Sequence, residues 1–387
     1  MNELNEEDKD YYVLLTGSKN NAGDYLIKYR AKLLFDELRK DRKYVDVDAW
    51  KPFDDETLTL VNNSKAVILM GGPALQRNMH PHIYPLTKNL DNIKAPIVTM
   101  GIGWKSNDGS WRKSRDYPLT ESTLKLLEKI DSSGIKSSVR DYHTLNALQH
   151  KGFKSFVMTG CPAFNDFKHL ENPTLDTAEI KKIAFSLGVS FLESNEMLEQ
   201  MRSNILGIRD GFPSTEIEVV FHHALSDEFL TTHNATDHHL AGHRKFADWL
   251  TNQGISFVDI SGSAENLVEC YSNADLHVGY RVHAHIFMTS IGKRSLLIAE
   301  DGRGKGVRLV MDGLVLDGVD EISENLFGKI LRRLKIRSGF SVDDSISNEV
   351  LNNLNYEIKN SYPRMRKSQI LLKDNFRTME KFLLQLP

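Results

Sequence analysis

The chain has 387 residues, of which 40% are apolar and 26% are charged, and its formal net charge is −3. This composition is typical of a globular protein and excludes an intrinsically disordered chain, while the small net charge excludes a general attraction to nucleic acid. The length suffices for two domains, because domains commonly run to roughly 100–200 residues.

The cysteine content and the apolar runs indicate the compartment. Cys161 and Cys270 lie far apart in the sequence and form neither a disulfide framework nor a cysteine metal motif, which is typical of a reducing compartment. The polar, acidic residues 1–10 contain no secretory signal. No apolar run approaches the roughly 20 residues that a membrane span needs. We therefore expect a cytoplasmic protein.

The first half of the chain alternates short apolar runs with amphipathic segments. A strand at residues 11–15 is followed by a polar turn at 18–22 and by a helix from about residue 23 to residue 39. Further strands are predicted at 66–70, 96–100, 137–139 and 156–158, and helices at 119–130 and 142–149. Strands that alternate with helices favour a mostly parallel sheet covered on both faces.

A polar stretch at residues 170–182 separates this half from a second series of apolar runs. The second series predicts strands at 183–187, 217–221, 255–260, 276–279 and 295–299, and helices at 195–205, 238–250, 265–271 and 282–291. We expect an N-terminal domain of residues 1–173, a C-terminal domain of residues 174–345 and a helical tail of residues 346–387. The predicted architecture is α/β, with two similar domains that face a cleft.

Several polar loops follow the predicted strands of the first half. In open α/β sheets, ligands bind beyond the carboxyl ends of the strands, where helix N-termini attract anions. The loops are GSKNNAGD at 17–24, MGGPA at 70–74, MGIGWK at 100–105 and SSVRD at 137–141. Asp24 is placed either to cap a helix or to bind a substrate hydroxyl. Arg140 is placed either to bind a carboxylate or phosphate, or to pair with Asp141.

The strongest candidate site is the segment DLHVGYRVHAH at residues 275–285. A strand ends at Gly279 and a helix begins near Val282, which places Arg281 and His283 close to a helix N-terminus. The segment AEDGRGKG, at residues 299–306, ends another strand and supplies two more cations. Several cations near helix amides fit a phosphate or carboxylate better than a neutral ligand.

The histidine pairs His222–His223 and His238–His239 are interpreted as surface or packing residues. Adjacent side chains diverge in strands and helices alike, so neither pair presents both rings to one metal ion. We expect no metal site.

Taken in order, these segments resemble the polysaccharide pyruvyl transferase family. The matching pieces are GSKNNAGD, MGGPA, MGIG, SSVRDYHTLNAL, VMTGCPA and GYRVHAHIFMTSIGKRSLLI, which together span about residues 13–310. No single piece is specific, whereas their ordered combination is. Two departures concern the presumed acceptor side: the family's glycine triplet is GGP at residues 71–73, and the N-terminal loop has NNA before GD.

The resemblance implies two Rossmann-like domains in a GT-B-like arrangement with a cleft between them. It also implies phosphoenolpyruvate as the donor co-substrate and, as acceptor, a sugar of a cell-surface polysaccharide or of its lipid-linked precursor. The implied donor ligands are Arg140, Arg281, Val282 and His283, together with Arg303 or Lys305. The implied acceptor side comprises Gly17, Asn20, Asn21, Asp24, Gly71, Gly72 and Gly103. No cofactor, metal ion or nucleic acid is implied.

The chemistry of enolpyruvyl transfer suits these residue types. Carbon C3 is protonated while a sugar oxygen adds to C2, phosphate leaves, and a second hydroxyl closes the ketal. Cations such as Arg140 stabilise the departing phosphate. His283 is then either the general acid or a phosphate ligand, and Asp24 is a candidate base for the acceptor hydroxyl.

Two other functions remain open at this point. A GT-B glycosyltransferase that uses a nucleotide-sugar would share the cations and would need an acid, Glu300 or Asp301, to bind the ribose. A non-catalytic glycan-binding protein is less favoured, because so many clustered cations require an anion. The basic, amphipathic residues 362–386 either pack as a helix on a domain or contact a membrane that carries a lipid-linked acceptor.

Overall fold

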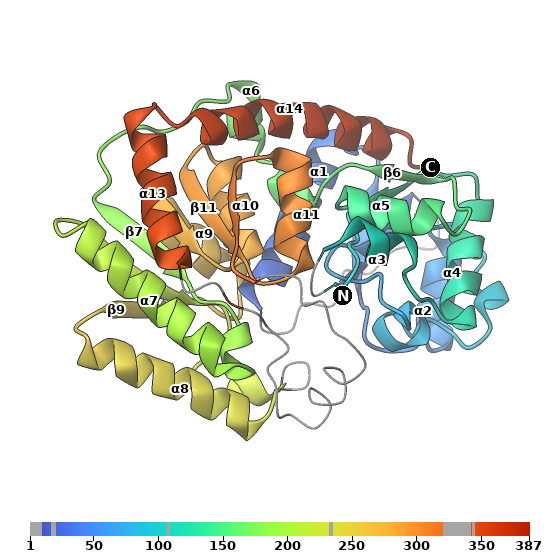
Figure 1. The fold of residues 1–387 in the computed structure, drawn as a ribbon. Coiled ribbons are helices and arrows are strands. Elements are labelled where there is room, and N and C mark those ends of the chain that lie inside the picture. The colour runs from blue at the N-terminus through green and yellow to red at the C-terminus, as the bar shows by residue number, and fades with distance from the viewer. Residues whose placement is uncertain (1–9, 17–20, 107–108, 232–234, 320–341, 343–344) are drawn as a thin grey trace. The chain divides into compact units, whose positions relative to one another are not determined.

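The computed structural model describes residues 10–16, 21–106, 109–231, 235–319, 342 and 345–387 (Figure 1). The chain divides into two compact units. The first unit comprises residues 1–18, 27–170 and 372–387, and the second comprises residues 19–26 and 171–371. Each unit is built around a parallel sheet, so the predicted α/β class with two Rossmann-like domains is confirmed.

The sheet of the first unit has the strand order β2-β1-β3-β4. Its strands are β1 (Tyr11–Thr16), β2 (Lys43–Asp48), β3 (Ala66–Met70) and β4 (Ile97–Met100), and all their pairings are parallel. A parallel pair, β5 (Ser137–Val139) and β6 (Phe156–Met158), follows, and a bridge joins Ile102 to Val139. The chain order therefore reverses between β1 and β3, which is where such sheets bind ligands.

Helices surround this sheet, and several of them begin at a side-chain cap. They are α1 (Ala22–Leu38), α2 (Asp55–Asn63), α3 (Trp111–Arg115), α4 (Glu121–Ser132), α5 (Tyr142–Gln149) and α6 (Phe167–Glu171), with short turns η1 (Met79–Ile83), η2 (Leu90–Asn92) and η3 (Pro162–Phe164). Asp54, Thr120 and Asp141 each accept a hydrogen bond from a backbone N–H in the first turn of α2, α4 and α5. These caps satisfy N–H groups that a helix leaves without partners.

The sheet of the second unit has the strand order β12-β11-β10-β7-β8-β9. Its strands are β7 (Lys182–Ser186), β8 (Glu216–Phe221), β9 (Ser256–Asp259), β10 (Leu276–Gly279), β11 (Arg294–Ala299) and β12 (Leu314–Asp317). Numbered from β7, this is the doubly wound order 3-2-1-4-5-6, whose topological switch point lies between the first strand and the fourth. Here that point lies between the ends of β7 and β10.

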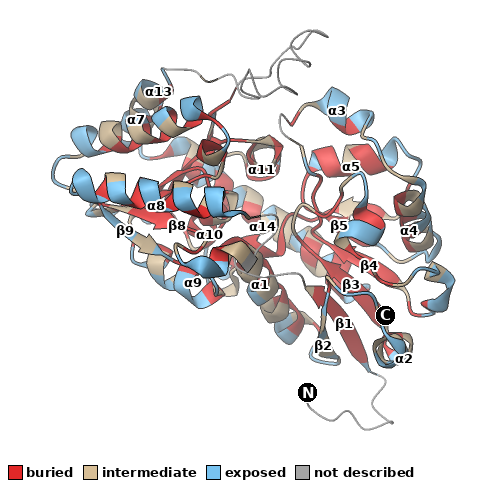
Figure 2. Cartoon of the chain, turned by 90° about the horizontal axis from the view of Figure 1, so that it is seen from below, coloured by how far each residue is buried: buried red, intermediate tan, exposed pale blue. Residues whose placement is uncertain are grey.

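The second unit also contains most of the long helices. They are α7 (Asn195–Gly211), α8 (Asp237–Asn252), α9 (Ala264–Ser272), α10 (Val282–Ser290), α11 (Gly302–Met311) and α13 (Ile346–Lys359), with short turns η4 (Ser190–Leu192) and η5 (Asp227–Thr231). The last helix, α14 (Pro363–Leu384), begins in the second unit, and its residues from Leu372 onward belong to the first. Figure 2 shows buried residues along the central strands and exposed residues on the outer faces of α7 and α8. Among the described residues, no helix is long and apolar enough to cross a membrane.

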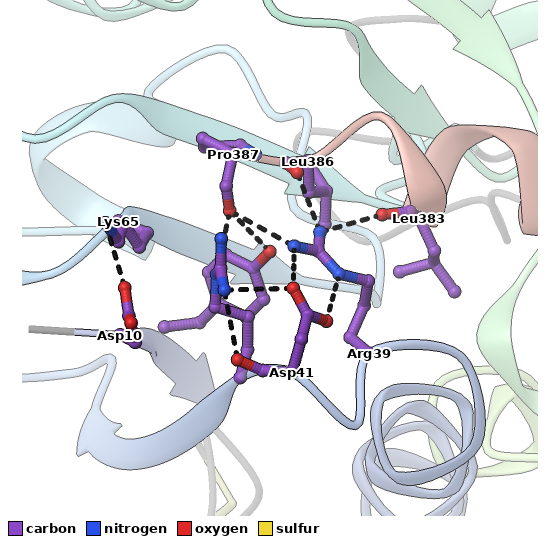
Figure 3. A network of polar contacts seen from close by, with 9 residues as sticks. Asp10, Arg39, Asp41, Lys65, Leu383, Leu386 and Pro387 are labelled. Carbon is purple, nitrogen blue, oxygen red and sulfur yellow. Dashed lines mark hydrogen bonds and ion pairs between the residues drawn. The ribbon is translucent and has the colours of Figure 1, made fainter.

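The last residues of the chain belong to the core of the first unit. Met379, Phe382 and Leu383, near the end of α14, are at most 2% exposed and pack with the strands of the first sheet. Arg39 donates hydrogen bonds to the carbonyl oxygens of Leu383 (3.1 Å) and Leu386 (2.7 Å), as Figure 3 shows. This segment is therefore part of the folded unit.

We expect Phe382→Ala to lower the free energy of unfolding by about 3–5 kcal/mol, because it removes a buried ring and leaves a cavity. Urea unfolding followed by circular dichroism measures this change. Leu384→Ala is the control, since Leu384 lies two residues away in the same helix and is 58% exposed. Equal losses in the two variants would contradict the burial of Phe382.

Four histidines of the second unit are buried, namely His222, His243, His277 and His285. Burial lowers the pKa of His243 to about 4. Burial lowers the pKa of His285 to about 3 and the pKa values of His222 and His277 well below their usual range. These side chains are therefore neutral in the folded protein at neutral pH.

The burial of these histidines predicts a loss of stability in acid. Below the unfolded pKa of about 6.5, the unfolded chain binds protons that the folded chain does not, so stability falls as the pH decreases. The fall is up to about 1.4 kcal/mol per pH unit for each histidine. We expect His285→Gln to reduce this slope in urea titrations between about pH 5 and pH 7.5. Exposed His238→Gln controls for the loss of a histidine, and identical slopes in the two variants would contradict the prediction.

Candidate active site

The segment from Gly279 to His283 leaves the sheet at the switch point of the second unit. Gly279 has a φ of 145°, and a Cβ there would lie 2.4 Å from the carbonyl oxygen of Ser186, so only glycine fits. The Tyr280 ring is 2% exposed and points into the core, where its hydroxyl donates to Gln200 Oε1 (2.8 Å) and accepts from Asn204 Nδ2 (2.8 Å). Tyr280 therefore anchors the segment, and the following residue begins the candidate site.

Arg281 is held from several sides. It is the N-cap residue of α10, its backbone N–H donates to Ser186 Oγ (2.9 Å), and its Nε donates to the Leu187 carbonyl oxygen (2.7 Å). Its Nη2 lies 3.0 Å from His223 Nδ1. Burial lowers the pKa of Arg281 to about 10, so it remains a cation at neutral pH. Side-chain hydrogen bonds within the described residues use two of its roughly five N–H donors.

The beginning of α1 lies against His283. A Cβ built on Gly23 would be only 2.2 Å from His283 Nδ1, so the first turn of α1 and the first turn of α10 touch at this point. Asn21 Oδ1 accepts the Gly23 N–H (3.0 Å), and the Ala22 N–H donates to the His222 carbonyl oxygen (3.4 Å). Asp24 follows directly, and its charge opposes the burial effect on the pKa of Arg281. The structure thus brings Asp24, Arg281 and His283 together in the second unit.

The acids that follow β11 already have partners within the second unit. Glu300 accepts hydrogen bonds from the backbone N–H groups of Val189 and Ser190 (3.1 Å each) and from the Ser190 hydroxyl (2.6 Å). Asp301 caps α11 and binds Arg303 through both Nε (2.7 Å) and Nη2 (2.6 Å). The charge of Asp301 raises the pKa of Arg303. Lys305 is partly exposed and forms no ion pair within the residues that the structure describes.

Arg140 lies in the first unit, at the end of β5. Its side chain is buried, and its backbone N–H donates to the Ile102 carbonyl oxygen (2.7 Å). A Cβ on Gly103 would lie 2.2 Å from Arg140 Nη2, so the glycine leaves room for the guanidinium group. The predicted pairing with Asp141 exists only as a 3.5 Å contact, because Asp141 also caps α5 through Thr144. Arg140 Nη2 is buried and has no hydrogen-bond partner among the described residues.

The two remaining acceptor-side glycines lie on the same loop of the first unit. Gly71 (φ 45°) and Gly72 (φ 69°) turn the chain directly after β3. The Gly71 N–H donates to the Met100 carbonyl oxygen and the Gly103 N–H to the Gly72 carbonyl oxygen, both at 2.8 Å. Gly71, Gly72 and Gly103 therefore follow β3 and β4 of the four-stranded sheet, and Arg140 follows β5 of the adjoining two-stranded sheet. The predicted residues Gly17 and Asn20 lie outside the described residues.

His223 makes a contact with a predicted site residue that sequence reasoning did not anticipate. The sequence predicts surface or packing roles for the His222–His223 pair; the His223 ring does pack against the Phe229 ring (centroids 5.4 Å apart), and its Nδ1 also lies 3.0 Å from Arg281 Nη2. The two histidine rings do diverge: His222 Nε2 lies 2.7 Å from the Tyr271 hydroxyl. The described residues contain no group of three or more His, Cys, Asp or Glu side chains that is arranged to hold a metal ion.

Comparison with known families shows where this arrangement belongs. Residues 21–302 match the sequence profile of a family described as polysaccharide pyruvyl transferase. The chain belongs to the polysaccharide pyruvyl transferase family. The predicted resemblance is thereby confirmed, and the protein is a transferase. The matched region of this pyruvyl transferase includes Arg140, Arg281 and His283, whereas Arg303 and Lys305 lie just beyond it.

Several solved structures are similar to this transferase, each at low sequence identity. UDP-GlcNAc 2-epimerase of Methanocaldococcus jannaschii is 10% identical, with a TM-score of 0.48 over 89% of this chain and 99% of that chain. UDP-GlcNAc 2-epimerase of Neisseria meningitidis is 11% identical, with a TM-score of 0.47 over 96% of this chain and 100% of that chain. A wall teichoic acid polymerase is 10% identical, with a TM-score of 0.40 over 98% and 91% of the two chains. These similarities carry no information on substrate, and no curated protein matches the sequence.

Proposed function

We propose that this transferase moves the enolpyruvyl group of phosphoenolpyruvate onto a sugar of a cell-surface polysaccharide or of its lipid-linked precursor. The observation that carries the proposal is Arg281, a buried cation at the switch point of a doubly wound sheet, beside His283. Family membership supports the same reaction class. A buried cation with N–H groups to spare suits a carboxylate or a phosphate.

The proposed reaction is balanced without any further reactant. A proton adds to C3 of phosphoenolpyruvate and a sugar hydroxyl oxygen adds to C2. The C2–O bond to phosphate then breaks, and a second hydroxyl of the same sugar closes a pyruvate ketal. Of the two protons that the hydroxyls lose, one balances the proton gained by C3 and the other leaves with phosphate. Arg281 stabilises the phosphate as it departs.

Residues in each unit have proposed roles. Arg281, Val282 and His283 bind the donor through side chains and helix N–H groups, and Asp24 serves as the base for the acceptor hydroxyl. Arg140 binds an anionic group in the first unit. Of the two cations on α11, Lys305 is the better donor ligand, because Arg303 is already paired with Asp301.

Deuterium incorporation tests the proposed reaction. The protein is incubated with phosphoenolpyruvate and a panel of glycans in D2O, and phosphate release and product mass are followed. We expect acceptor-dependent phosphate release and a product whose pyruvate methyl group carries one deuterium from solvent. Sugar addition from a nucleotide-sugar, with no product from phosphoenolpyruvate, would show that the protein is a glycosyltransferase instead.

The His283→Gln variant separates two roles of this residue. Glutamine donates a hydrogen bond but does not transfer a proton, so it replaces a phosphate ligand but not a general acid. If His283 is the acid, turnover falls by about 10²–10⁴-fold while the KM for phosphoenolpyruvate changes little. A raised KM with turnover largely retained would assign His283 to phosphate binding.

A further inference from the structure

A line of polar groups crosses the interior of the second unit and ends on Arg281. His285 Nδ1 lies 2.7 Å from Ser295 Oγ, and Ser295 Oγ lies 2.7 Å from His277 Nδ1. His277 Nε2 in turn lies 2.7 Å from Ser186 Oγ, which accepts the backbone N–H of Arg281. The line passes from α10 through β11, β10 and β7, which are neighbouring strands of the sheet.

The number of protons restricts how these groups bond. Burial keeps His277 and His285 neutral, so each ring carries one N–H. Ser295 has a single hydroxyl proton, yet its oxygen lies within hydrogen-bond distance of two ring nitrogens. If both rings donated to Ser295, its own proton would have no acceptor among the described residues, because its oxygen contacts no other polar group there. One ring nitrogen therefore accepts the hydroxyl proton and the other donates its N–H. The two histidines therefore have opposite tautomers at Nδ1.

The far end of the line decides the direction. His285 Nε2 is buried and has no hydrogen-bond partner among the described residues. A buried N–H without an acceptor is rare and unfavourable, so the proton of His285 belongs on Nδ1. His285 then donates to Ser295, Ser295 donates to His277 Nδ1, and His277 donates from Nε2 to Ser186.

This direction determines what Ser186 offers to Arg281. Ser186 Oγ accepts from His277 Nε2 and from the Arg281 N–H, which uses both of its lone pairs. Tyr271 is available to accept the remaining proton of Ser186, and the Tyr271 hydroxyl oxygen lies 2.7 Å from His222 Nε2. The lone pair that holds the N-cap of α10 is thus fixed by groups in three strands and two helices.

We propose that Ser186, His277, Ser295 and His285 are positioning residues, which hold Arg281 through a one-way hydrogen-bond chain with fixed histidine tautomers. None of the four is expected to touch the substrate. The effect of these four residues on donor binding rests on the proposed function. The histidine tautomers, in contrast, follow only from the hydrogen-bond distances and the burial of the two rings.

The tautomers are measured directly in the wild-type protein. ¹⁵N-histidine labelling with long-range ¹H–¹⁵N correlation distinguishes Nδ1–H from Nε2–H rings, and the His277→Asn and His285→Gln variants assign the signals. We expect His285 as the Nδ1–H tautomer and His277 as the Nε2–H tautomer near neutral pH. The reverse assignment, or rapid exchange between tautomers, would overturn the proposal whether or not phosphoenolpyruvate is the donor.

A pair of isosteric variants tests the link to Arg281. Ser295→Thr and Ser295→Val add the same volume, but only threonine keeps the hydroxyl that joins the two histidines. We expect the valine variant to have a KM for phosphoenolpyruvate up to about tenfold higher than the threonine variant, the equivalent of one hydrogen bond. Equal KM values would remove the positioning role. If the wild-type protein releases no phosphate from phosphoenolpyruvate, the proposed function is wrong. The tautomer measurement still shows whether the hydrogen-bond chain from His285 to Ser186 runs in the proposed direction.

Discussion

Replacing Arg140 with methionine is expected to abolish transfer while leaving the protein at least as stable as the wild type. Arg140 is 1% exposed, its contact with Asp141 is 3.5 Å long, and its Nη2 has no hydrogen-bond partner among the described residues. A buried cation with so little compensation opposes folding, and its replacement by an apolar side chain of similar length is neutral or stabilising. We expect the free energy of unfolding to stay the same or rise by about 1 kcal/mol.

The loss of activity has a separate cause. If Arg140 binds an anionic group in the reaction, its removal lowers turnover by about 10²–10³-fold, as for other groups that stabilise developing charge. Transfer assays and urea unfolding of the same preparation measure both quantities. A variant that is strongly destabilised and equally inactive would show that Arg140 has a structural role.

Arg294 supplies the matched control, because it is equally buried and its Nη2 also has no hydrogen-bond partner among the described residues, whereas its other guanidinium nitrogens are well bonded. It donates to the carbonyl oxygens of Asp275 (3.3 Å) and Ala178 (2.7 Å) and to the Tyr362 hydroxyl (3.0 Å), and it lies over the Tyr362 ring. We therefore expect Arg294→Met to lower the free energy of unfolding by about 2–4 kcal/mol. The opposite behaviour of the two arginines separates a cation kept for a ligand from one kept for the fold.

The central strands could be predicted from the sequence because a parallel sheet buries both faces of its inner strands. Continuous apolar runs such as AVILM at β3 and LLIA at the end of β11 carry that signal. The two strands that sequence reasoning missed, β2 and β12, lie at sheet edges. The sequence of β2, KYVDVD, alternates polar and apolar residues and stays partly exposed, so it has no continuous apolar run.

The predicted strands also indicate candidate site residues, because ligands bind beyond the carboxyl ends of strands in such sheets. Arg140, Arg281 and His283 are predicted site residues because each follows a predicted strand. His223 also follows a strand, β8, so the same rule indicates it as well. Diverging rings exclude a shared metal ion, whereas they do not exclude a contact between one ring and Arg281.

The position of the α1 N-terminus beside His283 could not be predicted from the sequence. Residues 22–24 contact residues about 200–260 positions away, and no local periodicity records such a contact. The sequence places Gly23 and Asp24 only in a polar loop that follows a strand, with Asp24 either as a helix cap or as a ligand of a substrate hydroxyl. The structure adds that the glycine is required because a ring occupies the space where its side chain would be.

Gly23→Ala is accordingly expected to impair transfer strongly although it adds only one methyl group. The new Cβ would lie 2.2 Å from His283 Nδ1 and 2.8 Å from its Cγ, so either the ring or the first turn of α1 must move. A displacement of about 1 Å at a catalytic group lowers turnover by roughly 10²-fold. Alanine favours the helix by about 1 kcal/mol over glycine, so a loss of activity would not reflect weaker helix formation.

A double-mutant cycle shows whether the effect passes through His283. If the methyl group acts by displacing the imidazole ring, Gly23→Ala has little further effect on transfer once the ring is absent in His283→Ala. Transfer rates of the wild type, the two single variants and the double variant complete the cycle. Strictly additive losses would mean that Gly23 acts on another part of the site, with Asp24 as the nearest group, whereas strong non-additivity places the ring of His283 and the first turn of α1 in one catalytic unit.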